Sequence, residues 1–158
     1  MENGTPSLQS VTASSSGPPA NITEFNRIAG LVFAQLYAQF PAVIDIDRQA
    51  IANAFGVQGS DWSAHQLPSG KKLSEMLAHT IGWLNHQGYI ASFGAHPAAW
   101  VMLSVKELAA LNATRQGLSA TVGSSLVKAA SEAGPNWSGI GDLVGGVFGG
   151  FTKSITGG

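Results

Sequence analysis

The sequence predicts a mainly α-helical fold with a small β-hairpin and a C-terminal helical extension. Several segments repeat apolar residues every three or four positions, whereas only residues 89–103 show two short apolar runs around a turn. A chain of 158 residues suits one domain with a core and tails. The expected parts are a disordered N-terminal arm over 1–20, the domain over 21–112, a helical extension over 113–137 and a glycine-rich amphipathic tail over 138–158.

The arm, residues 1–20, is rich in Ser, Thr, Pro and Gly and has few large apolar side chains. Such a composition cannot offset the conformational entropy lost on ordering, so disorder is predicted. The arm also lacks the apolar core of a signal peptide, and a cytoplasmic location is therefore expected.

The first helix is predicted over about 22–40. Asn21 and Glu24 have the spacing of a capping box, and Pro41 ends the apolar pattern. The positions that set the helical spacing are Phe25, Ile28, Val32 and Leu36. Because further apolar residues widen this face to roughly half of the circumference, we expect the helix at the centre of the core or shared with a second copy.

Two more helices follow. Asp47 can cap a short helix over 48–55, after which the polar residues 58–70 predict a loop. The third helix, which ends before Gly88, has the clearest apolar face. That face consists of Leu73, Met76, Leu77, Ile81, Trp83 and Leu84.

The hairpin is predicted from strands over 89–93 and 100–103 that flank a tip over 94–99. Ser104 and Glu107 then form a second capping box. The remaining helices are expected over about 104–111 and 118–133.

This order of elements resembles the winged-helix domain, a helix-turn-helix variant with a β-hairpin wing. The resemblance covers about 21–112 and is most specific at TIGWLNHQGYI (80–90), which is similar to a recognition helix that runs through a glycine into the first wing strand. The following VMLSVKELAAL is similar to a second strand that leads into a capped helix. The long 58–70 connection departs from a compact helix-turn-helix. The resemblance implies that the third helix would enter the major groove of DNA.

The outward face of the third helix supports DNA binding only weakly. Charged residues are 11% of the chain, the formal net charge is −1 and the wing tip has no Lys or Arg, so few phosphate contacts are available. In a dimeric regulator, the DNA-contacting residues would be Lys71, Lys72, His79, Asn85 and His86. The same face carries Ala78 and Gly82, which would let a partner backbone approach closely, although an ordinary solvated face is the alternative.

Catalysis and metal binding find no support in the sequence. The absence of Cys excludes disulfides, thiolate metal sites and Cys nucleophiles. His79 and His86 lie about 10 Å apart along a helix, too far for one zinc ion without a bend. No catalytic or phosphate-loop motif occurs. We expect no enzyme, metal, cofactor or small-molecule substrate, and a packing role for the tryptophans Trp62, Trp83, Trp100 and Trp137.

The tail reads IGDLVGGVFGGFTKSITGG from residue 140 to residue 158. Its apolar residues fall on one face of a helix, and the candidate partner-binding ones are Leu143, Val147, Phe148 and Phe151. Glycines at four-residue spacing, which permit close helix packing, are Gly141, Gly145 and Gly149. Because each glycine costs nearly 1 kcal/mol relative to alanine, the helix needs a surface to pack on. That surface would be its own domain, a second subunit, another protein or a membrane, and a disordered tail is the alternative.

These features favour a non-catalytic protein-interaction or assembly module. It would bind a protein partner or a second copy through the tail and the small-residue face of the third helix. The alternatives are a dimeric winged-helix DNA-binding regulator and a membrane-associated or pore-forming tail at residues 138–158.

Overall fold

The computed structural model describes residues 17–96, 98–114, 119–132 and 139–148. It confirms a mainly helical fold with one small antiparallel sheet. In chain order the elements are α2 (Ala20–Gln39), α3 (Arg48–Ala54), the 3-10 helix η1 (Ser60–Ala64), α4 (Leu73–His86), β1 (Ile90–Ser92), β2 (Val101–Leu103), α5 (Val105–Asn112) and α6 (Val122–Ser131). Residues 139–148 form one more helix, called here the tail helix.

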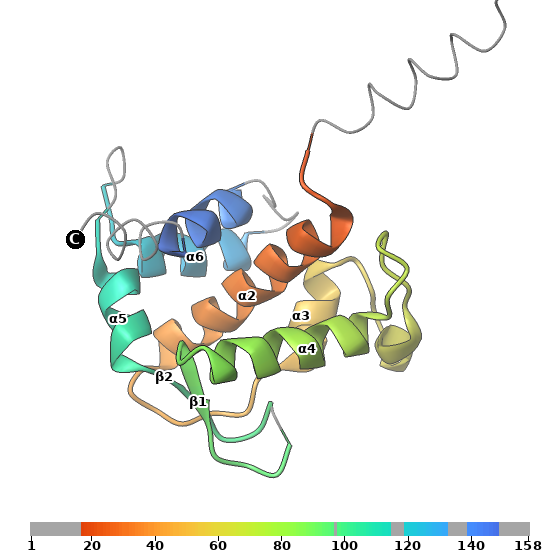
Figure 1. Ribbon diagram of the computed structural model, residues 1–158, viewed down its shortest axis with the longest axis horizontal. Helices are drawn as coiled ribbons and strands as arrows, with labels where there is room; N and C mark the ends of the chain where they lie inside the picture. Colours follow the sequence, from red (N-terminus) through yellow and green to blue (C-terminus); the bar gives the residue numbers. More distant parts are fainter. Residues whose placement is uncertain (1–16, 97, 115–118, 133–138, 149–158) are drawn as a thin grey trace, which may run out of the picture.

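Helix α2 is the centre of the molecule. It packs against α3, α4, α6 and β2, and Figure 1 shows it crossing the middle, with α4 on one side and α6 and the tail helix on the other. Its middle is buried without interruption from Ile28 to Ala34. The wide apolar face read from the sequence therefore serves contacts within one chain.

The sheet is a hairpin with a third chain segment beside it. Ile90 pairs with Leu103, and Ser92 pairs with Val101. Ile44 joins the outer side of β2, donating its N–H to the Val101 carbonyl at 2.9 Å and accepting the Val101 N–H at 2.7 Å. The order helix, extended segment, helix, helix, hairpin, helix is compatible with the winged-helix architecture.

Side-chain caps fix where three helices begin. Asp47 accepts the Ala50 N–H at 3.0 Å at the start of α3, as predicted. Ser104 accepts the Glu107 N–H at 3.1 Å at the start of α5, but the Glu107 carboxylate does not complete the predicted box. Thr121 caps α6, so that helix begins later than expected.

The predicted capping box at the start of α2 is wrong. The helix begins at Ala20 after Pro19, and no side chain caps it. Glu24 lies inside the first turns, is 2% exposed and accepts the Ser69 N–H at 2.9 Å. A tertiary contact to the loop before α4 has replaced the local cap.

The tail helix packs on its own domain. Ile140, Val144 and Val147 are buried, and Gly30 lies beneath the first two of them. The predicted helical spacing of the tail is thus confirmed over the described residues. Phe151 and Gly149 lie outside them, as do Trp137 and most of the predicted N-terminal arm.

Helix α6 also approaches α2 closely at a glycine. A Cβ at Gly123 would lie 2.6 Å from the ring of Tyr37. The Tyr37 hydroxyl donates to Asn112 Oδ1 at 2.7 Å and lies 3.2 Å from the Thr121 hydroxyl, so α5 and α6 are tied to the end of α2. The helical extension therefore belongs to the same packed body as the domain.

Substitution of Gly30 by Ala is expected to loosen the tail helix. The new Cβ would lie 2.5 Å from Ile140 Cγ2 and 2.9 Å from Val144 Cγ2. Both side chains are branched at Cβ and rotate away only at a cost. Overpacking of this kind costs about 1–3 kcal/mol, which exceeds the gain of under ~1 kcal/mol in helix propensity. We expect a lower Tm and faster amide hydrogen exchange over residues 140–147.

Gly82→Ala is the matched control, because an added Cβ in the middle of α4 meets no atom within 4 Å. This variant should be stabilised by about 1 kcal/mol through helix propensity alone. Equal effects of the two substitutions would contradict the close approach at Gly30.

Candidate interaction surfaces

The outward face of α4 presents all five residues considered for DNA contact. Their side chains are exposed over the whole length of the helix and its preceding turn; they are Lys71, Lys72, His79, Asn85 and His86. Asn85 already accepts the Ser92 N–H through Oδ1 at 3.2 Å, so part of its hydrogen-bonding capacity holds the start of the hairpin. The basic groups are concentrated before the first turn of α4.

The small residues of α4 are also on the surface. Ala78 and Gly82 are exposed, and the space next to Gly82 is open. The space next to the tail glycines Gly141 and Gly145 is open as well, since an added Cβ would meet nothing within 4 Å at either position. Among the described glycines, the close helix approaches occur instead at Gly30 and Gly123.

The apolar residues predicted for partner binding in the tail lie on or near the domain. Val147 is 6% exposed, and Leu143 and Phe148 are half-buried against the core. The Phe148 ring lies 5.7 Å from that of Trp83 and 5.0 Å from that of Tyr89, both edge-on. The described part of the tail therefore buries much of its apolar face in its own chain.

A different apolar surface is left uncovered on the outer side of the sheet. Val101, Leu103 and Ile90 are buried, so strand alternation turns their neighbours outward. Pairing aligns these outward positions in rows across the three segments. We call them the wing face, which consists of Val43, Ala91, Phe93, Trp100 and Met102.

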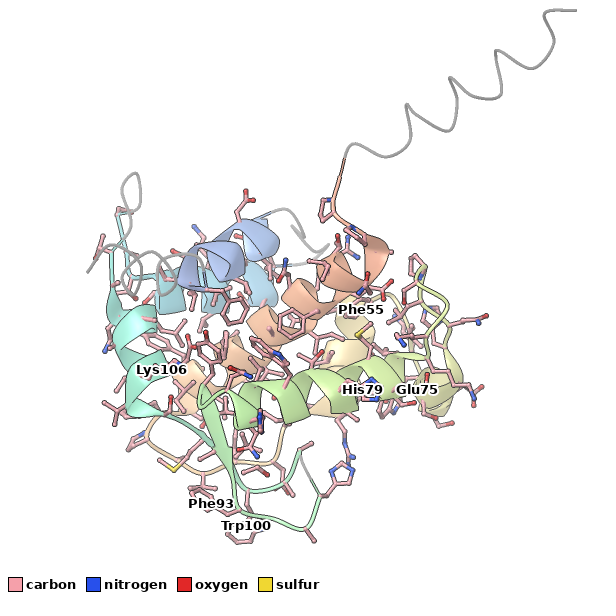
Figure 2. All side chains as sticks on the ribbon, viewed as in Figure 1. Phe55, Glu75, His79, Phe93, Trp100 and Lys106 are labelled. Atoms are coloured by element: carbon pink, nitrogen blue, oxygen red, sulfur yellow. The ribbon has the colours of Figure 1, made fainter. Side chains whose placement is uncertain are left out.

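Phe93 and Trp100 dominate the wing face. They are 65% and 63% exposed, and Figure 2 shows both beyond the strands, on the side of the molecule away from α2. The Phe93 N–H donates to the Trp100 carbonyl at 3.0 Å, which places the two residues opposite each other. Val43 is 41% exposed in the neighbouring segment.

The backbone at Trp100 is held in an unusual conformation. Its φ is 54°, in the left-handed region that costs a residue with a side chain about 1 kcal/mol or more. The Asp45 carboxylate accepts the Trp100 N–H at 3.0 Å, and Asp45 lies on the segment paired to β2. A hydrogen bond from its backbone N–H to the Asp45 side chain thus fixes the backbone that carries an exposed indole at the end of the hairpin.

The predicted packing role of Trp100 is therefore wrong, and that of Trp83 holds only in part. Trp83 stacks on Tyr89 at 5.8 Å but stays 42% exposed at the edge of the core. The sequence indicates an extended segment at residues 43–46, because the polar Asp45 lies between the apolar Ile44 and Ile46. The wing face could not be predicted from this pattern without knowing that the segment pairs with β2.

Glu107 is the one strongly perturbed carboxyl group among the described residues. It is fully buried on α5, and neither carboxylate oxygen has a hydrogen-bond partner in the described part of the chain. Burial raises the pKa of Glu107 to about 8, although neighbouring Lys106 acts in the opposite direction. Lys106 itself donates to the Gln87 carbonyl and lies 4.1 Å over the ring of Tyr89. No catalytic partner for Glu107 follows from this arrangement.

Across the described ranges, no group of three His, Asp or Glu side chains is arranged to hold a metal ion. In the same ranges, no helix has the length and apolar character needed to cross a bilayer. Comparisons with protein-family models, with curated proteins and with solved structures gave no significant match. The functional argument therefore depends on the surfaces themselves.

Glu107 is expected to make the protein less stable as the pH rises. The folded carboxyl group keeps its proton up to a pKa of about 8, whereas in the unfolded chain it ionises near its ordinary pKa of 4.5. Between these values the folded state binds more protons, so the free energy of unfolding falls with rising pH and levels off above 8. Glu107→Gln should remove this slope and raise the stability at pH 8 by about 1–3 kcal/mol relative to the wild type.

The measurement is a series of denaturant titrations of both proteins from pH 5 to pH 9. The difference between them isolates Glu107, since histidines contribute equally to both. Parallel stability profiles over the whole range would contradict a proton held by Glu107 in the folded state.

Proposed function

We propose that this protein is a non-catalytic assembly module that associates with a second copy of itself through the wing face. The observation that carries the proposal is the exposure of Phe93 and Trp100, 65% and 63%, side by side on one sheet face. Large exposed apolar side chains that lie together on one face are typical of protein interfaces, where hot spots are enriched in Trp and other large residues.

The chemistry of the wing face favours a protein partner of like character. Its residues in strand register are apolar, and Asp45 is the charged residue aligned with Trp100. A two-fold interface brings the same patch of both subunits together, so an apolar face can bury its apolar side chains against those of a second copy. The formal net charge of −1 means that two copies repel each other little.

The ordered backbone at Trp100 also supports binding. The Trp100 backbone N–H is held by Asp45, and the hairpin is held by its pairing with Ile44. A backbone that is already ordered loses less conformational entropy when the surface binds. The strained backbone at Trp100 has no role in the core, since its side chain lies outside it.

Trp100→Ser should weaken self-association about 30-fold or more, because truncation of a central Trp commonly costs 2 kcal/mol or more at an interface. Phe93→Ser should act in the same direction. The measurement is the monomer–dimer dissociation constant from sedimentation equilibrium of the full chain.

Val105→Ser is the matched control. Val105 is 86% exposed on α5, outside the wing face, so its loss removes exposed apolar surface without touching the interface. Its dissociation constant should equal that of the wild type. A wild-type protein that stays monomeric at the highest soluble concentration would contradict self-association.

A second candidate is binding to duplex DNA by such a dimer. It is favoured by the exposure of the five candidate DNA-contacting residues on α4 and in the turn before it. Lys71→Ala with Lys72→Ala should weaken duplex binding and lower its salt dependence, since two phosphate contacts are lost. No binding of the wild type to mixed-sequence duplex DNA at low salt would end this proposal.

A further inference from the structure

An open groove of about 360 Å³ lies between the N-terminal end of α2 and α4. It is formed by residues from the first two turns of α2, by residues of α4 between Met76 and Trp83, and by Lys71 before α4. It is separate from the wing face, which lies at the hairpin. Its volume falls within the roughly 300–1,000 Å³ that is usual for small-molecule sites.

The walls of the groove are apolar and partly open to solvent. Ile22 and Trp83 are 44% and 42% exposed, and Phe25 and Met76 complete the lining. The Trp83 indole is fixed by edge contact with Phe25 at 5.2 Å and by stacking on Tyr89. The groove is thus bounded on one side by an aromatic wall with a defined position.

A buried hydroxyl group lies in the lining. Thr80 is 1% exposed, and its Oγ1 has no hydrogen-bond partner among the described residues. A buried hydroxyl without a partner costs about 1–3 kcal/mol, which a ligand oxygen would relieve once rotation about χ1 turns the hydroxyl toward the groove. This is the feature that distinguishes the groove from a shallow apolar depression.

The polar rim carries positive charge. Lys71 and His79 both line the groove, and Lys71 is the charged residue among the lining residues. The Ser69 hydroxyl accepts the Lys71 N–H at 3.3 Å, and the Ser69 N–H is held by Glu24 at 2.9 Å. The buried carboxylate of Glu24 therefore positions the loop that brings Lys71 to the groove.

We propose that this groove binds a small molecule with an apolar body and one carboxylate group, such as a medium-chain fatty acid. The apolar body would lie against Phe25, Met76 and Trp83. The carboxylate would pair with Lys71 and accept a hydrogen bond from the Thr80 hydroxyl. Charge-assisted hydrogen bonds of this type are stronger than neutral ones, so the head group sets the specificity.

The test is a titration of the full chain with decanoate, and with decanol as the uncharged ligand of equal chain length. Isothermal calorimetry gives the affinity, and the methyl NMR signals of Ile22 and Met76 give the place of binding. Decanoate should bind more tightly than decanol and should shift these two methyl signals first.

Lys71→Ala should weaken decanoate binding at least about tenfold and leave decanol binding nearly unchanged, because only the head group is affected. Lys72→Ala is the matched control, since the adjacent Lys72 is exposed but does not line the groove. Thr80→Val, which keeps the shape and removes the hydroxyl, should also weaken decanoate binding more than decanol binding.

Three results would overturn the proposal. The first is the absence of saturable decanoate binding by the folded wild type. The second is equal effects of Lys71→Ala and Lys72→Ala. The third is a shift of the Phe93 and Trp100 signals before those of Ile22 and Met76, which would show adsorption on the wing face.

Discussion

The packing of the tail helix on α2 at Gly30 is the contact on which the rest of the structure depends. Helix α2 has a wide apolar face that is buried from Ile28 to Ala34, and α4 alone covers only part of it. Ile140 and Val144 close that part only because position 30 has no side chain. The burial of three aliphatic side chains of the tail helix contributes several kcal/mol, at about 1.5–3 kcal/mol for each fully buried group. This offsets the low helix propensity of its glycines.

The same contact extends to α4 through aromatic rings. Phe148 lies against Phe25, Phe33, Trp83 and Tyr89, so one residue of the tail links α2 with the end of α4 and the start of the hairpin. Trp83 is thereby fixed in place although it is partly exposed. The position of the tail and the shape of the groove beside Trp83 are consequently coupled through a single ring cluster.

Much of the fold could be predicted from local signals. The spacing of apolar residues located α2, α4 and the tail helix, and Asp47 and Ser104 marked where α3 and α5 begin. The errors have tertiary causes. Glu24 has the spacing of a capping residue but binds Ser69, 45 positions away, because burial beside the loop supplies a better partner than its own helix end. In the sequence, Gly30 cannot be distinguished from any other glycine that a helix tolerates. Only the structure shows that the tail helix packs against it.

The candidate surfaces were harder to predict for a related reason. Whether Trp100 packs inward or outward depends on its φ of 54° and on the pairing of Ile44 with Val101, neither of which is encoded by periodicity. The apolar residues of the tail were predicted to bind a partner, but the described ones are largely buried within the chain. Apolar pattern alone therefore identifies which residues need covering, and the fold decides which of them remain uncovered. Here the residues that remain are Phe93 and Trp100. The Asp45 carboxylate holds the Trp100 backbone in the conformation from which the indole points outward, and this is the physical reason to place the partner at the wing face.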